Sequence, residues 1–90
     1  MIYKVYIVEC ADKTLYTGYT KLLGRRVLQH NVSVSGAKYT ESRRPVKLVY
    51  YESYPTQHQA MQREAEIKRL TRKQKLVIIT NSAHNTKKPI

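Results

Sequence analysis

Five side chains of the kinds used in hydrolytic chemistry occur where one fold could bring them together: Tyr6, Tyr16, Arg26, His30 and Glu64. Arg26 and His30 lie one turn apart on a predicted helix whose other residues along that stripe are apolar. Glu64 shares a predicted helical face with apolar residues three and four positions away. Carboxylates are almost never fully buried without a partner, so Glu64 requires a cationic side chain or a metal ion.

These groups suit the hydrolysis of phosphodiester bonds, which needs an activated nucleophile and compensation for charge on the phosphoryl oxygens. Glu64 can supply the carboxylate that a hard cation such as Mg²⁺ binds while keeping several waters. Arg26 offers a planar fork that matches phosphate. A free tyrosine has a pKa of about 10, so a tyrosine acting as a base needs nearby cations that favour its ionised form.

Each of these residues also has an ordinary structural explanation. Glu64 could form an ion pair with Arg26, or Arg26 could extend along the protein surface. His30 could bond to a backbone carbonyl, and the tyrosines could be half-buried sheet residues. The chemical interpretation therefore depends on the whole set and not on any one member.

A β-hairpin must position the two tyrosines. β-Branched and aromatic residues alternate over residues 2–9 and 14–18, on either side of a polar turn. Alternation sends Val5 and Ile7 to one face of the first strand and Tyr6 to the other. Gly18 is expected to break the second strand, after which Thr20 can cap a helix over residues 21–30.

The second half of the chain continues with a strand over residues 46–51 and then two helices. Thr56 has capping-box spacing to Gln59, and Thr71 begins a third, short helix by the same pattern. The resulting order β-β-α-β-α-α predicts an α+β fold with helices packed around a three-stranded sheet. We expect one domain over residues 1–80 and a mobile basic tail over residues 81–90.

The charge of the chain indicates a polyanionic partner. Among 90 residues, 17 Lys and Arg stand against 6 Asp and Glu, which gives a formal net charge of +11. This excess is larger than solubility requires and favours nucleic acid. A membrane surface is disfavoured because no segment shows a basic amphipathic helix, and charge used only for solubility is the remaining alternative.

A polar segment over residues 31–45 is long for a small domain, and such loops are often functional. The residues that we expect to contact nucleic acid are Lys38, Tyr39, Arg43 and Arg44, together with Tyr19. Basic groups with an aromatic among them can bind phosphates and stack on a base, although a solvated loop is equally consistent with this composition.

The single cysteine, Cys10, excludes an internal disulfide and a cysteine-rich zinc site. The first residues lack the pattern of a signal peptide, and no apolar run approaches the ~20 residues of a membrane helix. We therefore expect a cytoplasmic protein that does not enter the membrane.

Two short motifs and an arginine resemble the signature of the GIY-YIG nuclease superfamily. The motifs are Lys4-Val5-Tyr6 and Tyr16-Thr17-Gly18, and Arg26 follows Tyr16 by ten residues. The likeness extends from about Ile2 to about Ile79 and is greatest to small stand-alone bacterial members. It implies a mainly antiparallel sheet and a metal-dependent endonuclease that acts on DNA, with DNA repair or processing as the expected setting.

The resemblance also implies a role for each residue. Tyr6 and Tyr16 are the paired active-site tyrosines, one of which activates the attacking water. Arg26 stabilises the transition state, and Glu64 holds one divalent metal, Mg²⁺ or Mn²⁺. His30 matches a position usually filled by His or Tyr and assists proton transfer.

Two positions depart from the family pattern. Tyr19 stands where some members have a lysine, and Leu76 stands where many have an asparagine that contacts the substrate. Two other functions therefore stay open. One is a nucleic-acid-binding module with the nuclease fold but little activity, which acts on DNA or RNA and depends on a partner protein. The other is an RNA-associated protein, for which a glutamate on an apolar face has no use.

Overall fold

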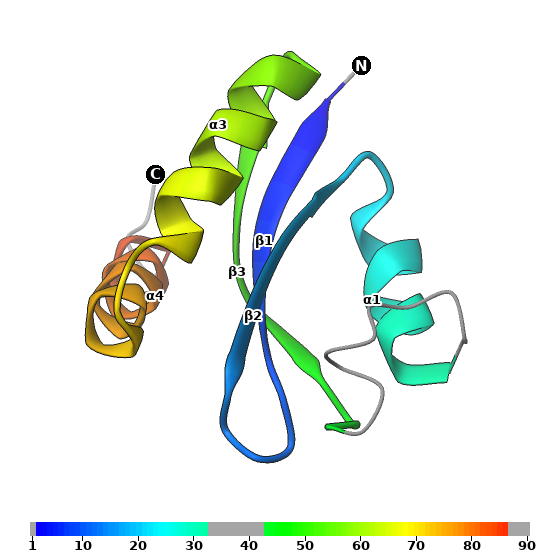
Figure 1. Ribbon diagram of the computed structural model, residues 1–90, viewed down its shortest axis with the longest axis vertical. Coiled ribbons are helices and arrows are strands. Elements are labelled where there is room, and N and C mark those ends of the chain that lie inside the picture. Colours follow the sequence, from blue (N-terminus) through cyan, green and yellow to red (C-terminus); the bar gives the residue numbers. More distant parts are fainter. Residues whose placement is uncertain (1, 33–42, 87–90) are drawn as a thin grey trace.

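The computed structural model describes residues 2–32 and 43–86, which form one antiparallel sheet and three helices (Figure 1). The strands are β1 (Tyr3–Glu9), β2 (Leu15–Thr20) and β3 (Lys47–Tyr54). The helices are α1 (Leu23–Val32), α3 (Gln57–Lys68) and α4 (Arg72–Thr86). The predicted α+β class and the order β-β-α-β-α-α are confirmed.

The hairpin turn is closed by an aspartate. Asp12 Oδ1 accepts hydrogen bonds from the backbone N–H of Thr14 at 3.1 Å and from its hydroxyl at 2.6 Å. Lys13 adopts the left-handed conformation with a φ of 71°. This turn fixes the register in which β1 and β2 pair, and places Tyr6 directly opposite Gly18.

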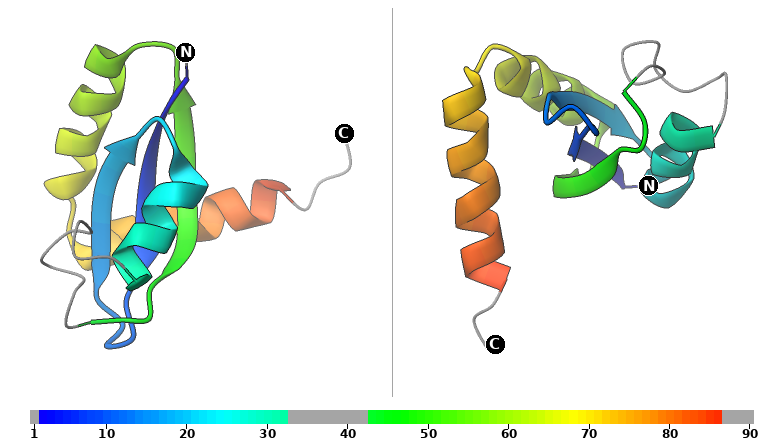
Figure 2. Two further views of the ribbon diagram at one scale, coloured as in Figure 1. Left: turned by 90° about the vertical axis from the view of Figure 1, so that its right-hand side faces the viewer. Right: turned by 90° about the horizontal axis from the view of Figure 1, so that it is seen from below.

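The sheet has the strand order β2-β1-β3 and is covered on both faces (Figures 1 and 2). One face buries Val5 and Ile7 against Ala60 and Ile67 of α3. The opposite face buries Tyr6 in a second cluster, against which α1 packs. The alternation predicted for the first strand is therefore confirmed.

The predicted caps of the two later helices are present. The hydroxyl of Thr56 accepts from the N–H of Gln59 at 3.2 Å. Thr71 and Gln74 form a reciprocal box, with bonds of 3.2 Å and 2.9 Å between side chain and backbone.

The structure corrects the predicted end of the second strand. Gly18 lies inside β2, which continues to Thr20. The hydroxyl of Thr20 accepts from the N–H of Leu22 at 3.1 Å, and α1 begins only at Leu23. Leu22 is consequently 58% exposed and does not belong to the apolar stripe of the helix.

The third helix is longer than the short helix predicted from the sequence, and the mobility of residues 81–90 stays a prediction. α4 continues to Thr86 and extends away from the sheet (Figure 2). The capping box at its start and the absence of Gly and Pro between Thr71 and Pro89 allow the helix to propagate. Residues 87–90 of the predicted tail, and residues 33–42 of the predicted polar loop, lie outside the described residues. None of the helices described is long and apolar enough to span a membrane.

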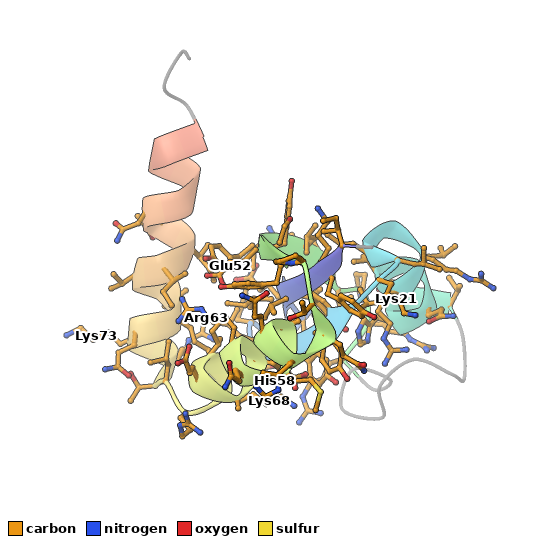
Figure 3. All side chains as sticks on the ribbon, turned by 90° about the horizontal axis from the view of Figure 1, so that it is seen from above. Lys21, Glu52, His58, Arg63, Lys68 and Lys73 are labelled. Atoms are coloured by element: carbon orange, nitrogen blue, oxygen red, sulfur yellow. The ribbon has the colours of Figure 1, made fainter. Side chains whose placement is uncertain are left out.

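A charged cluster joins α3 to β3 on the face opposite α1 (Figure 3). Glu52 accepts two bonds from Arg63, at 2.9 Å and 3.0 Å, and further bonds from the hydroxyls of Tyr50 and Tyr54. Burial alone would raise the pKa of Glu52, but the hydrogen bonds from Arg63 and the tyrosines outweigh burial and lower it. Burial and the bond to Glu52 raise the pKa of Tyr54 to about 12.

We expect Glu52→Gln to lower the free energy of unfolding at pH 7 by about 2 kcal/mol, because it leaves the half-buried Arg63 without its bidentate partner. Since the pKa of Glu52 is lowered in the fold, its contribution is present above the ordinary glutamate pKa of 4.5 and is lost as the pH falls further. Urea unfolding would measure both effects.

Glu66→Gln is the matched control for this change. Glu66 also contacts Arg63, at 3.4 Å, but its side chain is 55% exposed compared with 17% for Glu52. We expect Glu66→Gln to change the stability by less than about 0.5 kcal/mol. Equal effects of the two substitutions would show that the buried cluster contributes no more than a surface ion pair.

Candidate active site

A tyrosine and a histidine are paired at the centre of the α1 face. The hydroxyl of Tyr6, on β1, lies 2.8 Å from Nε2 of His30, on α1. Tyr6 is 1% exposed and His30 is fully buried. The ring of Tyr16, on β2, meets the His30 ring edge to face, with 5.2 Å between centroids. Three of the five predicted catalytic residues are thus in direct contact.

Gly18 makes this pairing possible. A Cβ atom at Gly18 would lie 2.5 Å from the hydroxyl oxygen of Tyr6 and 2.7 Å from the ring carbon that carries it. Such distances are far below van der Waals contact, so the tyrosine occupies the space of the missing side chain. The glycine is needed so that the Tyr6 ring can approach the backbone of the neighbouring strand. It is not needed for a turn, because no glycine of the described residues has a positive φ.

Two further residues hold α1 in place: Asn31, which the sequence did not single out, and Arg44, which was predicted to contact nucleic acid. Asn31 pairs with the backbone of Val46, donating from Nδ2 at 3.0 Å and accepting at Oδ1 at 2.7 Å. Arg44 donates from Nε to the backbone carbonyl of His30 at 2.6 Å. These bonds fix the end of the helix that carries His30.

The surroundings set the protonation of the pair. Burial, and then the charges of Arg26 and Arg44, lower the pKa of His30 to about 4. Burial also raises the pKa of Tyr6 above 10, and the hydrogen bonding and charge of Arg26 oppose this without cancelling it. At neutral pH the site therefore contains an uncharged imidazole and a protonated phenol.

The charges of Arg26 on α1 and Glu64 on α3 both change the pKa of Tyr6, in opposite directions. Arg26 is half-buried on α1, where Nη1 donates to Oε1 of Gln29 at 3.2 Å. Glu64 lies on α3 with a side chain that is 20% exposed, and its negative charge raises the pKa of Tyr6. The carboxylate pairs with Lys68 at 3.6 Å, so the ion pair with Arg26 considered from the sequence is replaced by a pair within α3.

Among the described residues, one carboxylate acts on Tyr6, and a single carboxylate fits a cation that keeps most of its water. Among residues 2–32 and 43–86, no group of three or more His, Cys, Asp or Glu could hold a metal. Glu64 is the carboxylate whose charge reaches Tyr6. Mg²⁺ is commonly bound by one or two carboxylates together with waters, which matches a site of this composition.

The residues predicted to contact nucleic acid are dispersed. Tyr19 lies on the α3 face of the sheet, and its hydroxyl accepts from Nε2 of Gln57 at 3.2 Å. Arg43 pairs with Asp12 at 3.0 Å, beside the hairpin turn. Arg44 contacts His30 as described above. Lys38 and Tyr39 lie outside the described residues, so their role stays a prediction.

Comparisons with known proteins agree on one relationship. A family model described as the GIY-YIG catalytic domain matches residues 2–77. A UPF0213 protein of Staphylococcus epidermidis is 57% identical over 75 residues, which cover 83% of this chain and 90% of that protein. A UPF0213 protein of Syntrophus aciditrophicus is 52% identical over the same length, covering 83% and 86%.

Two solved structures are also similar. The solution NMR structure of the UPF0213 protein BH0048 from Bacillus halodurans has a TM-score of 0.58 and 42% identity, covering 89% of this chain and 84% of that chain. The solution NMR structure of EF2693 from E. faecalis has a TM-score of 0.63 and 39% identity, covering 92% and 88%.

We expect Gly18→Ala to displace the Tyr6 hydroxyl from His30 and to lower stability by about 1–3 kcal/mol, because the new methyl group overlaps the phenol. The histidine ring resonances in NMR spectra would report the lost contact, and thermal unfolding would report the stability.

Gly24→Ala is the matched control. Gly24 lies in α1, and a methyl group added there would meet no heavy atom within 4 Å. Alanine at this position should raise stability by up to about 1 kcal/mol, since it favours the helix. A tolerated Gly18→Ala with unchanged histidine resonances would contradict the close-approach role of Gly18.

The lowered pKa of His30 predicts a pH-dependent stability. Because the fold favours the uncharged imidazole, the contribution of His30 to stability is complete above about pH 6.5. This contribution is lost as the pH falls toward about 4. Between pH 7 and pH 5 this amounts to about 2 kcal/mol. Unfolding at the two pH values measures the loss, and NMR titration of the ring gives the pKa directly.

His58→Gln should keep this pH dependence, because His58 is exposed on α3. His30→Gln should remove it. A titration midpoint of the buried ring near 6.5 would show that the site does not hold His30 in its uncharged form.

Proposed function

Since the chain belongs to the GIY-YIG catalytic-domain family, we propose that it is a divalent-metal-dependent endonuclease that hydrolyses phosphodiester bonds, with DNA favoured over RNA. The observation that carries the proposal is the buried pair of Tyr6 and His30 at 2.8 Å, with the charges of Arg26 and Glu64 both acting on the phenol. A purely structural core has no use for two opposite charges converging on a buried hydroxyl.

Tyr6 and His30 form the proton-handling part of the site. The uncharged imidazole can accept the phenol proton, which would leave Tyr6 able to take a proton from water. Without substrate this transfer is unfavourable, because the pKa of Tyr6 is raised while that of His30 is lowered to about 4. The phenol therefore stays protonated until positive charge is added beside it, which restricts base catalysis to the assembled complex.

Glu64 is the residue that would hold a divalent cation, Mg²⁺ or Mn²⁺. When bound, such a cation supplies positive charge that compensates the phosphoryl oxygens and reverses the effect of Glu64 on Tyr6. Lys68 must then release the carboxylate, which is feasible because its side chain is 51% exposed and can turn into solvent.

Arg26 and Tyr16 complete the proposed roles. The half-buried guanidinium of Arg26 can bind a non-bridging phosphoryl oxygen, where its fixed charge stabilises the transition state. Tyr16 packs its ring on His30 and holds the imidazole in line with Tyr6. The basic surface attracts the polyanionic substrate, and a protein partner is proposed to contribute to substrate choice.

A binding module with little activity is the second candidate, and one observation favours it. The Glu64 carboxylate is already paired with Lys68, and the pKa of Tyr6 is raised and not lowered. Both features describe an inactive arrangement unless a cation replaces the lysine.

Cleavage of labelled duplex, branched, single-stranded and RNA substrates in Mg²⁺, Mn²⁺ or EDTA tests the proposal. We expect metal-dependent cutting that falls at least 100-fold in Tyr6→Phe and Glu64→Gln. The first change removes only a hydroxyl, and the second removes only a charge.

Glu66→Gln provides the matched control, since it removes one carboxylate from an exposed position of the same helix. It should keep the rate within about threefold. Cutting that survives in EDTA or in Glu64→Gln would overturn the metal-dependent mechanism. Binding without cutting by the unaltered protein would favour the binding module.

A further inference from the structure

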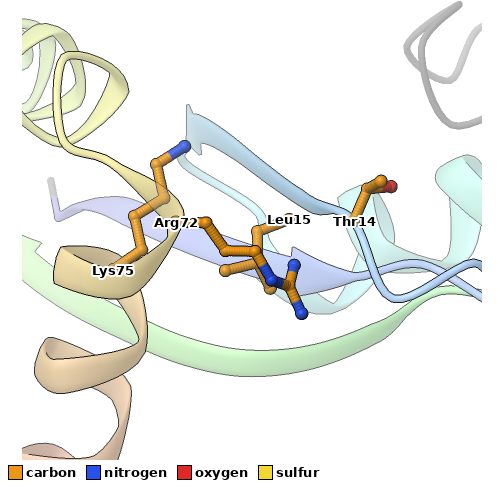
Figure 4. A pocket seen from close by; sticks show the side chains of 4 residues that line it. All are labelled: Thr14, Leu15, Arg72 and Lys75. Atoms are coloured by element: carbon orange, nitrogen blue, oxygen red, sulfur yellow. The ribbon is translucent and has the colours of Figure 1, made fainter.

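A small basic pocket lies away from the Tyr6 and His30 pair, between α4 and the hairpin (Figure 4). It has a volume of about 210 Å³ and is lined by Thr14 and Leu15 from the hairpin and by Arg72 and Lys75 from α4. Both charged residues that line the pocket are cations. Ligand pockets are commonly about 300–1,000 Å³, so this one suits a single chemical group better than a whole metabolite.

The pocket is held in shape by a bond across its rim. Arg72 Nη1 donates to the backbone carbonyl of Lys13, which lies in the left-handed turn of the hairpin. This bond ties the start of α4 to the hairpin and leaves the other N–H groups of the guanidinium without partners among the described residues. Asp12, in the same turn, is paired with Arg43 and does not neutralise the pocket cations.

A row of charged groups leads from the pocket to the proposed metal ligand. Lys75 and Lys68 lie near enough that, after burial, the charge of Lys68 is the next cause of the lowered pKa of Lys75. Lys68 in turn contacts Glu64 at 3.6 Å. The order is therefore Glu64, Lys68, Lys75 and Arg72, with cations at every step beyond the carboxylate.

We propose that this pocket binds a backbone phosphate of the nucleic acid. This phosphate belongs to the same strand as the phosphodiester bond that is hydrolysed beside Glu64. The inference rests on the proposed function for the identity of the polymer. Arg72 and Lys75 supply the forked and the point-like donors that phosphate oxygens accept from, and they stand on one face of α4 because they are three residues apart. Leu15 forms an apolar wall of the pocket.

Lys68 has two roles in this arrangement. Without substrate it pairs with Glu64, and with substrate it can turn to the phosphate between Glu64 and the pocket. The strand that fills the pocket thereby draws the lysine from the carboxylate, and binding of the backbone promotes access to Glu64.

Binding measured without cleavage tests the pocket separately from catalysis. Fluorescence anisotropy with labelled duplex and single-stranded DNA in EDTA would compare the unaltered protein, Lys75→Gln and Arg72→Gln/Lys75→Gln over a range of salt. Each lost phosphate contact should lower the magnitude of the log–log salt slope by about 0.9 on duplex DNA or about 0.7 on a single strand. The double variant should bind roughly tenfold more weakly at moderate salt.

Lys73→Gln is the matched control, because it removes one charge from an exposed position of α4 that does not line this pocket. It should leave the salt slope unchanged. Lys75→Gln keeps the bond from Arg72 to the hairpin, so a loss of fold in the double variant, seen by thermal unfolding, would not obscure the result. If the salt slope of Lys75→Gln equals that of Lys73→Gln, the proposal that this pocket binds phosphate is wrong.

A single methylphosphonate, which removes one backbone charge, identifies the phosphate. Placed at successive positions, it should weaken binding by the unaltered protein at one position where it has no effect on Lys75→Gln. If the protein cuts DNA but no such position exists, only the pocket fails. If the position exists and nothing is cut, only the nuclease proposal fails. If no nucleic acid binds, both fail.

Discussion

The close approach of the Tyr6 ring to the backbone at Gly18 is the constraint on which the site depends. A phenol can lie on the α1 face of the sheet, within 2.8 Å of His30, only because no side chain rises from the opposite strand. That approach requires one register, since a slip of one residue would oppose Tyr6 to Thr17 or Tyr19. Asp12 fixes the register through its two bonds to Thr14, so a turn at the surface governs the geometry of the buried pair.

This constraint could have been derived from the sequence. A hairpin turn centred on Asp12 pairs residues whose numbers are symmetric about it, and Tyr6 and Gly18 are such a pair. We interpreted Gly18 as a strand break because glycine is usually unfavourable in strands. The register shows instead that the glycine accommodates a large aromatic side chain on the neighbouring strand. The alternation of Val5 and Ile7 against Tyr6, and the caps at Thr56 and Thr71, needed only local patterns and were predicted correctly.

The remaining contacts depend on tertiary geometry that local patterns do not encode. Asn31 and Val46 are fifteen residues apart, and the bond from Arg44 to His30 spans fourteen. Neither can be assigned until α1 is placed against the sheet. The partner of Glu64 illustrates the same limit: its face on the helix was predictable, but the choice between Arg26, Lys68 and a metal depends on distances. The third helix was predicted to be short because the periodicity stops near Thr80, yet backbone hydrogen bonding continues it to Thr86.

The charges around Tyr6 act on its pKa in opposite directions. Glu64 raises the pKa of Tyr6 and Arg26 lowers it, while burial outweighs both. The phenol is therefore held in its protonated form chiefly by burial, to which Glu64 adds a smaller effect. Any positive charge that neutralises Glu64 removes one cause of that inactivity and adds an opposing one. Lys68 places a solvated positive charge beside this carboxylate, and such a half-exposed pair is weak enough for a stronger cation to displace it. Under the proposed function, the reactivity of Tyr6 depends on what occupies Glu64, and through Lys68 it would be coupled to what lies along the basic row beyond it.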